Sequence, residues 1–496
     1  MSQAVSKHSL ILGLGSSGLA MARWCARAGG QVTVADTRSE PPQLAALIAE
    51  VPTAAFVHSE MDSELLTLGS FDRVLKSPGL SPQSVSAVMA AATAGSIARG
   101  NELSLFAEAL AGLKAERDYR PQVVGITGTN GKTTVTALTG KLIGAAGKPV
   151  AVAGNIGPTL LETLARRIDT DTLPEVWVLE LSSFQLDGVE NFEPSVATVL
   201  NITQDHLDWH GSLDAYAEAK ARIYGRGQML LNRDDPLVMA AVPLPVKGKP
   251  TRSYVTFGSD EPRRPGDYGL ESVNGMTWLV RALEADETIR RKKGEEVVLH
   301  IQRLMPADAL RIRGRHNAVN ALAALALAVS VGCPMAPMLH ALRDYRGEPH
   351  RVESIATVNE VEYFDDSKGT NVGATVAALV GLGAERRLVL IAGGEGKGQD
   401  FSPLADPVSR YVRAVVLIGR DAARIEAALA ASGVAVITAE SLPAAVALAS
   451  RHAQAGDAVL MSPACASFDM FDNYEHRARV FVEAVQALAH DRGVLV

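Results

Sequence analysis

The stretch from Val123 to Thr134, Val-Val-Gly-Ile-Thr-Gly-Thr-Asn-Gly-Lys-Thr-Thr, combines residue types that suit phosphate chemistry. Apolar residues lead into a glycine-rich turn, then come Lys132 and two threonines, and the residues after them have helical character. Glycines let backbone N–H groups close around phosphate oxygens, and a helix N-terminus adds positive partial charge. A lysine there reaches the outer phosphates, and the hydroxyl that follows can coordinate Mg²⁺. The usual spacing G-x-x-x-x-G-K-[ST] is missed because Ile126 stands where its first glycine belongs, yet the pattern predicts a nucleotide site.

Two further apolar runs end in polar residues. Glu180 closes the run that begins at Val176, and Asp205 and His206 follow the run from Val196 to Asn201. A buried charge is costly unless it is paired or bound to a metal, and Mg²⁺ is the natural partner in a nucleotide-binding sheet. A structural ion pair is the alternative for Glu180, and a structural role is the alternative for His206.

The N-terminal part contains a second glycine turn. Gly13, Gly15 and Gly18 form G-x-G-x-x-G after an apolar run, and Asp36 ends the next predicted strand. Ser77-Pro-Gly79 ends another strand at the same edge of the predicted sheet. Taken alone, this arrangement predicts a dinucleotide site. The same turn can also hold the diphosphate of a different nucleotide.

Polar groups also gather elsewhere along the chain. Asn155 follows a strand and could face a ligand, whereas Asn317 and Asn320 share one helical face, and helix N-capping accounts for Asn317 equally well. Lys220 lies in the predicted helix 213–224, where an exposed side chain is the default. In the C-terminal part, polar turns follow predicted strands at 364–371, at 387–398 and at 458–469.

The length of 496 residues, the 47% hydrophobic content and the alternation of strands with helices predict an α/β protein with several domains. We expect three domains, each built on a mostly parallel, doubly wound (Rossmann-like) sheet, with the central one of the phosphate-loop type. We place them at residues 1–118, 119–347 and 348–496. Residues 258–300 are expected to be a surface elaboration.

Composition excludes several classes of protein. The net charge is −7, and the one short basic run, Arg290 to Lys293, is followed at once by two glutamates, so it predicts a solvated loop and no nucleic-acid partner. Cys25, Cys333 and Cys465 form no C-x-x-C pair, which fits a reducing cytoplasm. The N-terminal apolar run is broken by glycines, so neither a signal peptide nor a membrane span is expected.

Taken together, these motifs resemble those of the Mur ligases, the ATP-dependent amino-acid-adding enzymes of bacterial cell-wall precursor synthesis. The motifs shared in form are Gly128–Thr134, Glu180–Leu186, Asp205–Asp208, His316-Asn317 with Asn320, and His350-Arg351. Asp366–Asn371 and Ser462–Asp469 resemble the D-glutamate-adding branch, and the Asp-Asn-Pro-Arg expected of a diaminopimelate-adding relative is absent. The resemblance covers all three predicted domains.

The resemblance implies ATP-dependent ligation of D-glutamate to UDP-N-acetylmuramoyl-L-alanine through an acyl phosphate and a tetrahedral intermediate. It implies two Mg²⁺ ions, held by Thr133, Glu180 and His206, and by Lys220 if that lysine is carbamylated to N6-carboxylysine. It also implies a cytoplasmic enzyme that acts as a monomer on small-molecule substrates. Lys132, Glu180, His206 and Lys220 would be the catalytic residues.

The resemblance assigns the binding residues as follows. ATP would be bound by Gly128, Thr129, Asn130, Gly131, Lys132, Thr133, Thr134, Asn317, Asn320, Arg351, Asp366 and Lys368. The UDP substrate would be bound by Ser16, Ser17, Asp36, Thr37, Arg38, Ser77, Pro78, Gly79 and Asn155. D-glutamate would be bound by Thr370, Lys397, Ser467, Phe468 and Tyr474.

Two departures and three alternatives remain open at this point. Gln204 stands where many members have an acidic residue, and the 258–300 segment is longer than in compact members. A related ligase that adds another amino acid is the nearest alternative. An NAD-dependent oxidoreductase would use the Gly13–Gly18 turn but leaves Lys132 and Glu180 without a role, and a non-catalytic nucleotide-gated binding protein is the third.

Overall fold

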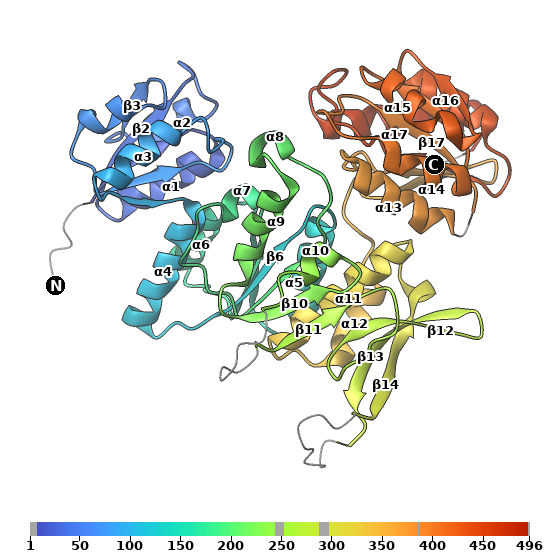
Figure 1. Cartoon of the computed structure of the whole chain (residues 1–496), viewed down its shortest axis with the longest axis horizontal. Coiled ribbons are helices and arrows are strands. Elements are labelled where there is room, and N and C mark those ends of the chain that lie inside the picture. The colour runs from blue at the N-terminus through green and yellow to red at the C-terminus, as the bar shows by residue number, and fades with distance from the viewer. Residues whose placement is uncertain (1–6, 244–251, 287–296, 385, 495–496) are drawn as a thin grey trace.

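The computed structural model describes residues 7–243, 252–286, 297–384 and 386–494. Three α/β lobes follow one another along the chain, with the N-terminal and C-terminal lobes on either side of the middle one (Figure 1). This arrangement confirms the predicted fold class. None of the helices in the described ranges is long and apolar enough to cross a membrane.

The N-terminal lobe contains a five-stranded parallel sheet in the order β3-β2-β1-β4-β5. Its strands are β1 His8–Leu12, β2 Gln31–Asp36, β3 Ala55–His58, β4 Arg73–Lys76 and β5 Ala98–Gly100. The helices are α1 Ser16–Arg27, α2 Leu44–Glu50, α3 Ser86–Ala94 and α4 Glu102–Arg117. The strand order reverses beside β1, and ligands of such sheets bind beyond the carboxyl ends of the strands at that point. The predicted glycine turn lies there.

The middle lobe contains a six-stranded parallel sheet in the order β11-β10-β9-β6-β8-β7. Its strands are β6 Gln122–Thr127, β7 Val150–Gly154, β8 Val176–Glu180, β9 Val196–Val199, β10 Gln228–Asn232 and β11 Tyr254–Phe257. The helices are α5 Lys132–Ala145, α6 Leu160–Asp169, α7 Ser183–Leu186, α8 Leu207–His210, α9 Leu213–Ala221, α10 Pro236–Met239, α11 Arg315–Ser330 and α12 Met335–Arg343.

The central strand β6 determines where the polar residues of the middle lobe meet. It pairs in parallel with β8 on one side, where Ile126 lies opposite Glu180, and with β9 on the other, where Thr127 lies opposite Val199. Strand β8 is buried along its whole length, as expected for a parallel strand covered on both faces. The loop after β6 therefore begins between Glu180 and the residues that follow β9.

The segment expected to be a surface elaboration contains a three-stranded antiparallel sheet, β12 Tyr268–Val273, β13 Met276–Glu284 and β14 Leu299–Pro306. Its inner side chains, among them Leu270, Leu279 and Met305, join the apolar core around α11, so this part of the segment is not merely superficial. Charged residues, such as the paired Glu271 and Arg303, alternate with the apolar ones along these strands. The buried face of the sheet was therefore not predicted from the sequence. The predicted solvated loop at Arg290–Lys293 lies outside the described residues.

The C-terminal lobe contains a six-stranded sheet in the order β15-β16-β20-β17-β18-β19, parallel except for the edge strand β15. Its strands are β15 Glu353–Val358, β16 Val361–Asp365, β17 Leu388–Gly393, β18 Val412–Ile418, β19 Ala435–Thr438 and β20 Ala458–Met461. The helices are α13 Val372–Gly383, α14 Ala405–Tyr411, α15 Ala422–Leu429, α16 Leu442–His452 and α17 Tyr474–Asp491.

The N-terminal and middle lobes share one core. Buried side chains of α1, α4 and α6 belong to a single apolar cluster, and Arg27 of α1 forms an ion pair with Asp169 of α6. Lys76, at the end of β4, forms a second ion pair with Asp187, 3.2 Å away. These contacts fix the N-terminal sheet against the middle lobe.

Gly18 and Gly15 of the N-terminal turn allow a paired test. A methyl group on Gly18 would lie 2.1 Å from the carbonyl oxygen of Gly13, whereas one on Gly15 would have no heavy atom within 4 Å. Gly18→Ala should therefore destabilise the N-terminal lobe by about 1–3 kcal/mol through overpacking, and Gly15→Ala should destabilise it less, through the poorer N-cap of α1 alone. Thermal denaturation of both variants beside the parent protein measures this. Equal stability of the two variants would contradict the packing argument.

Candidate functional site

The phosphate-type loop joins β6 to α5. Gly131 precedes the first helical residue with φ +82°, and no side chain caps this helix. The first N–H groups of α5 are therefore open to an anion, as helix N-termini generally are. The Nζ of Lys132 donates hydrogen bonds to the carbonyl oxygens of Gly128 and Thr129, each 2.8 Å away. The loop thus has the geometry predicted for binding phosphate.

Asn201 holds the shape of this loop from the neighbouring strand end. Its side chain accepts a hydrogen bond from the backbone N–H of Asn130 at 2.8 Å and donates one to the carbonyl oxygen of Asn130 at 3.1 Å. Thr129 is held in a similar way, since its hydroxyl oxygen accepts from the N–H of Thr203 at 3.0 Å. The loop is therefore shaped before any ligand binds.

Glu180 has the environment of a metal ligand. Its side chain is 1% exposed, and its Oε1 accepts a hydrogen bond from Asn155 at 3.0 Å. Its Oε2 is buried without any hydrogen-bond partner. An orphaned carboxylate oxygen is costly in the protein interior, and oxygen ligands of this kind suit Mg²⁺. The residue therefore fits the divalent cation implied by the resemblance.

His206 follows β9 and lies at the same edge of the middle sheet as Glu180, with β6 between their two strands. It has a left-handed backbone with φ +53° and precedes α8, and its ring meets Phe184 edge-on with centroids 4.7 Å apart. Its Nε2 lies 3.6 Å from an oxygen of Asp205. Burial, together with nearby lysines, lowers the pKa of His206 despite this aspartate. A neutral imidazole is the form that can coordinate a metal.

Lys220 is not the exposed helical lysine that its spacing predicts by default. Its side chain is 1% exposed, and its Nζ lies 2.8 Å from the carbonyl oxygen of Gly128 and 4.4 Å from the ring centroid of Tyr216. Burial and the positive charge of Lys132 lower the pKa of Lys220 well below its ordinary value. Both lysines therefore hydrogen-bond to the same carbonyl of the loop.

The C-terminal lobe contacts the phosphate-type loop directly. The guanidinium of Arg351 donates to the hydroxyl oxygen of Thr133. Asn371 exchanges side-chain hydrogen bonds of 3.1 and 3.3 Å with Asn130, and it also donates to Asp205 at 3.3 Å. Arg351 was predicted to bind the nucleotide, whereas no role was predicted for Asn371.

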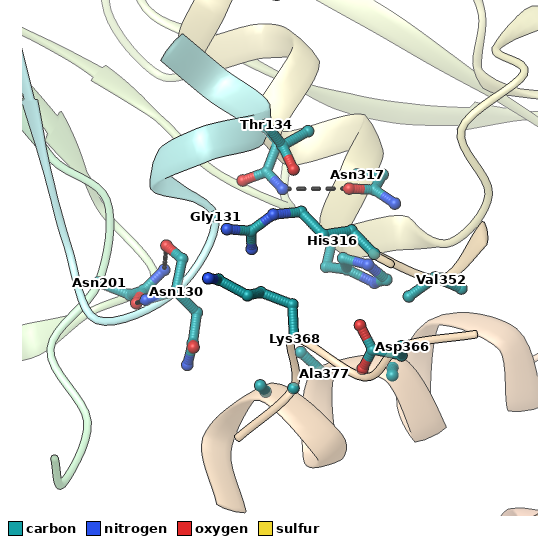
Figure 2. Close-up of a pocket in the computed structure, with 15 residues that line it drawn as sticks. Asn130, Gly131, Thr134, Asn201, His316, Asn317, Val352, Asp366, Lys368 and Ala377 are labelled. Atoms are coloured by element: carbon teal, nitrogen blue, oxygen red, sulfur yellow. Dashed lines mark hydrogen bonds between the residues drawn. The ribbon is translucent and has the colours of Figure 1, made fainter. Parts of the chain in front are cut away.

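A pocket lies between the middle and C-terminal lobes (Figure 2). It is lined by Asn130, Gly131, Thr134, Asn201, His316, Asn317, Asn320, Arg351, Val352, Asp366, Lys368, Gly369, Ala374, Ala377 and Ala378. Eight of the residues predicted to bind ATP are among them: Asn130, Gly131, Thr134, Asn317, Asn320, Arg351, Asp366 and Lys368. The structure therefore gathers parts of the chain more than 200 residues apart around one cavity.

Two ionisable groups of the pocket, Asp366 and Lys368, have strongly shifted pKa values. Burial raises the pKa of Asp366 to about 7, although a hydrogen bond from Ser462 at 2.6 Å opposes this. Burial and the charge of Arg351 lower the pKa of Lys368 to about 8. In Figure 2 the Lys368 side chain extends from the C-terminal lobe toward Asn130 and Gly131.

Asn317 is not the N-cap of its helix, because that position is taken by Gly314. Asn317 instead donates to the carbonyl oxygen of Arg313 at 2.8 Å and accepts from Asn320 at 3.2 Å. Asn320 also approaches Gly131, where an added methyl group would lie 2.9 Å from its side-chain oxygen. The two asparagines therefore join α11 to the phosphate-type loop.

The residues predicted to bind D-glutamate lie in the C-terminal lobe. Lys368 lies 3.5 Å from the ring centroid of Tyr474, and Thr370 follows two residues later on the same turn. Ser467 is buried, whereas the Phe468 side chain is 65% exposed. Lys397, with φ +49°, is exposed yet close enough for its charge to lower the pKa of His206 in the middle lobe.

Eight of the nine residues predicted to bind the UDP substrate surround the carboxyl edge of the N-terminal sheet, whereas Asn155 follows β7 in the middle lobe and is bonded to Glu180. Asp36 accepts hydrogen bonds from the backbone of Leu14 and from Arg38. Although burial opposes it, these bonds lower the pKa of Asp36 to about 2. The hydroxyl of Ser77 donates to the carbonyl oxygen of Gly13 at 2.8 Å. These two side chains therefore shape the turn, while Ser16, Thr37, Arg38 and Gly79 are exposed around it.

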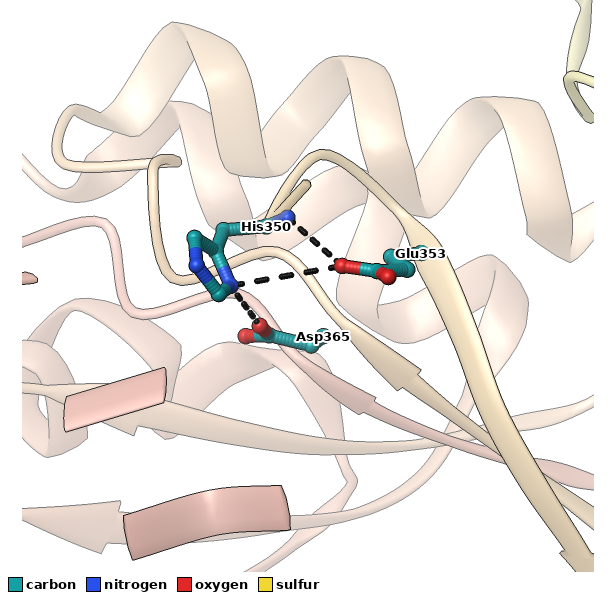
Figure 3. Close-up of side chains that lie close together, drawn as sticks. All are labelled: His350, Glu353 and Asp365. Atoms are coloured by element: carbon teal, nitrogen blue, oxygen red, sulfur yellow. Dashed lines mark hydrogen bonds and ion pairs between the residues drawn. The ribbon is translucent and has the colours of Figure 1, made fainter. Parts of the chain in front are cut away.

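His350, which precedes Arg351 in the chain, forms a compact group with Glu353 and Asp365 (Figure 3). The Nδ1 of His350 lies 2.7 Å from Asp365 and 4.0 Å from Glu353, which also accepts from the backbone N–H of His350 at 2.8 Å. These bonds hold His350 in a left-handed conformation with φ +63°. The group therefore restrains the backbone directly before Arg351.

Sequence reasoning assigned no role to Asn201, Asn371 or Ser462, each of which touches a predicted site residue. Asn201 and Asn371 carried a usable signal, since both stand at polar turns after predicted strands. Ser462 carried a weaker signal, because the residue that it contacts, Asp366, lies 96 residues away in the sequence.

Comparison with known families gives matches over most of the chain. Residues 7–99 match the model described as Mur ligase MurD-like, N-terminal domain. Residues 126–328 match the Mur ligase middle domain, and residues 350–465 match the Mur ligase, glutamate ligase domain. The three matches follow the order of the three lobes.

Curated relatives and solved structures agree with these matches. The UDP-N-acetylmuramoylalanine--D-glutamate ligase of Albidiferax ferrireducens is 66% identical over 99% of this chain and 98% of the relative, and that of Ralstonia nicotianae is 58% identical over 99% of each. The MurF ligase of Thermotoga maritima, solved in complex with ADP, is similar in fold with a TM-score of 0.56 at 16% identity, covering 99% of this chain and 97% of that one. Full-length similarity at this level, with three consecutive family domains, shows that the chain belongs to the Mur ligase family.

Proposed function

We propose that the chain is an ATP-dependent ligase that joins D-glutamate to UDP-N-acetylmuramoyl-L-alanine, releasing ADP and phosphate, in the synthesis of cell-wall precursors. The observation that carries the proposal is the junction of the middle and C-terminal lobes. There, an open helix N-terminus, Lys132 and the Glu180 carboxylate, one oxygen of which has no hydrogen-bond partner, lie close to Arg351 and Lys368. The curated relatives named for this reaction are similar along their whole length.

The chemistry accounts for a phosphate loop in an amide-forming enzyme. A carboxylate is a poor acyl donor, so its oxygen first attacks the γ-phosphorus of ATP, giving an acyl phosphate and ADP. The amine of D-glutamate then adds to the acyl carbon, and phosphate leaves from the tetrahedral intermediate. Phosphoryl transfer needs mainly positioning and neutralisation of charge. Lys132 and the N–H groups of α5 provide both without a nucleophilic side chain.

Divalent cations complete this charge balance. Glu180, neutral His206 and the Thr133 hydroxyl are the side chains that would hold Mg²⁺, which supplies charge neutralisation on the phosphates. Asn155 would hold Glu180 in its orientation through their 3.0 Å hydrogen bond. Thr133 would have to exchange Arg351 for the metal, because its hydroxyl oxygen accepts from that guanidinium.

Lys220 is suited to become N6-carboxylysine. Carbon dioxide adds only to a neutral amine, forming an N–C bond with loss of one proton, and the burial that lowers the pKa of Lys220 favours that neutral form. Carbamate formation would convert the Lys220 side chain, which competes with Lys132 for the Gly128 carbonyl, into an anion that attracts Lys132. A carboxylate-like oxygen pair near Glu180 would also suit a second Mg²⁺ ion.

The three predicted domains divide the substrates between them in this proposal. Residues 1–118 bind the UDP end of the acceptor, with Ser16, Thr37 and Arg38 available at the sheet edge. Residues 119–347 bind ATP, and residues 348–496 bind D-glutamate. The contact of Asn371 with Asn130 supports closure of the third domain over the ATP site, which would exclude water from the acyl phosphate.

The reaction itself is tested by phosphate release. Release should require ATP, UDP-N-acetylmuramoyl-L-alanine and D-glutamate together, and L-glutamate, L-alanine and L-lysine run in parallel should give little turnover. Equal turnover with L-glutamate would remove the D-glutamate assignment and leave a related ligase. Release with ATP alone would favour a nucleotide-gated binding protein, and a nicotinamide fluorescence titration would expose an oxidoreductase.

Lys132→Met tests the phosphate contact. Turnover should fall by roughly 10³ or more, because a charge that stabilises the transferring phosphoryl group is lost. The melting temperature should change little, since the side chain fills no core. Lys141→Met is the matched control, because Lys141 lies on the same helix α5 and packs over Tyr345 instead. A Lys132→Met enzyme with near-normal turnover would refute the role.

Lys220→Ala tests the carbamate. Activity should be lost and should return in part with added short-chain carboxylates, which can occupy the position of the missing anion. Lys132→Ala serves as the comparison, because a carboxylate cannot replace a cation. Absence of any rescue, together with an unmodified lysine in the mass spectrum of the native enzyme, would exclude the carbamate.

A further inference from the structure

Arg477 is a buried cation in the C-terminal lobe. It lies in the first turns of α17, is fully buried, and is one of the largest side chains with no exposed surface. Within the described ranges it forms no ion pair, and its Nε has no hydrogen-bond partner. Its only hydrogen bonds there run to backbone carbonyls: Nη1 donates to Cys465 at 3.1 Å and Nη2 to Ser367 at 2.9 Å.

A charge buried at this position destabilises the folded state. Burial lowers the pKa of Arg477 to about 10, while nearby acidic groups oppose the shift, so the guanidinium remains charged at neutral pH. Charges buried without an adjacent counter-ion cost several kcal/mol, and an apolar side chain of similar volume often serves stability better. The retained cation therefore calls for a role other than filling space.

The two carbonyl groups belong to two loops that carry predicted substrate residues. Ser367 follows β16 and stands between Asp366 and Lys368, on the turn that continues to Thr370. Cys465 follows β20 and stands two residues before Ser467. The strands pair in parallel, with Asp365 opposite Met461, but beyond their ends no ladder holds the loops together.

Few other bonds join these loops. Ser462 donates to Asp366, and the backbone N–H of Ala464 donates to the carbonyl oxygen of Gly369 at 3.0 Å. Ser462 and Ala464 both lie between the end of β20 and Cys465. Ala466 is paired with Glu395 of a third loop, but among the bonds that join the two loops to each other, those of Arg477 lie nearest in the chain to Ser467 and Phe468. The same helical turn of α17 places Tyr474 against Lys368, so one end of α17 contacts the first loop twice and the second loop once.

We propose that Arg477 is a positioning residue for the amino-acid substrate: its guanidinium fixes the Asp366–Thr370 loop against the Cys465–Phe468 loop. The inference rests on the proposed function for the identity of that substrate. The two Nη atoms of a guanidinium are a fixed distance apart. Because each of them donates to a different loop, the guanidinium also fixes the distance between the two loops. Arg477 itself is fully buried and does not contact the substrate.

Kinetics of Arg477→Met and Arg477→Lys test this role. Arg477→Met should raise KM for D-glutamate at least tenfold and leave KM for UDP-N-acetylmuramoyl-L-alanine within twofold, because that substrate binds mainly the N-terminal lobe. A lysine reaches one carbonyl but not both, so Arg477→Lys should lie between Arg477→Met and the parent enzyme. Arg479→Met is the control, since Arg479 is exposed on the same helix.

The outcomes separate this inference from the proposed function. An unchanged KM for D-glutamate in folded Arg477→Met, or an equal rise in every KM, overturns the positioning role. If Arg477→Met does not fold, parent-like kinetics of Arg477→Lys overturn it instead. If the parent enzyme prefers another amino acid, the reaction assignment fails, and the same KM comparison with that amino acid still decides the role of Arg477.

Discussion

The carbonyl group of Gly128 accepts hydrogen bonds from two lysines, Lys132 and Lys220, each at 2.8 Å. Two ammonium groups on one acceptor repel each other, and burial makes the repulsion stronger. Burial and the charge of Lys132 accordingly lower the pKa of Lys220 well below its ordinary value. Two amines on one carbonyl make this end of the loop suited to an anionic ligand.

The C-terminal lobe adds to this excess of positive charge. Arg351 and Lys368 project into the pocket, and the charge of Lys397 reaches His206. The opposing acidic groups of the middle lobe, Glu180 and Asp205, are too few to neutralise all of these cations. A polyphosphate and a dicarboxylate amino acid are the kinds of ligand that would balance the site. The lobes meet here through polar bonds such as that of Asn371 to Asn130.

The parts of this site that sequence could predict are those determined by local pattern. Glu180 was predicted at a buried strand end because an uninterrupted apolar run that stops at a charged residue is typical of a parallel strand reaching the sheet edge, and β8 confirms it. The burial of Lys220 was not predictable from spacing, because its partner Gly128 lies 92 residues away and only the packing of α9 brings them together. Arg477 gave no local signal for the same reason, and its carbonyl partner in Ser367 lies 110 residues away.

A glycine-rich turn follows a strand in each of the three lobes, yet the side chains after the glycines differ in charge from one turn to the next. In the N-terminal turn the side chains that follow are the neutral Ser16 and Ser17, and the carboxylate of Asp36 is already bonded to Leu14 and Arg38. In the middle lobe Lys132 follows and faces the loop's own carbonyls. In the C-terminal lobe Lys397 stands in a left-handed conformation and is exposed. Glycine therefore provides the close backbone approach in each case, and the charge of the neighbouring side chain distinguishes the three turns.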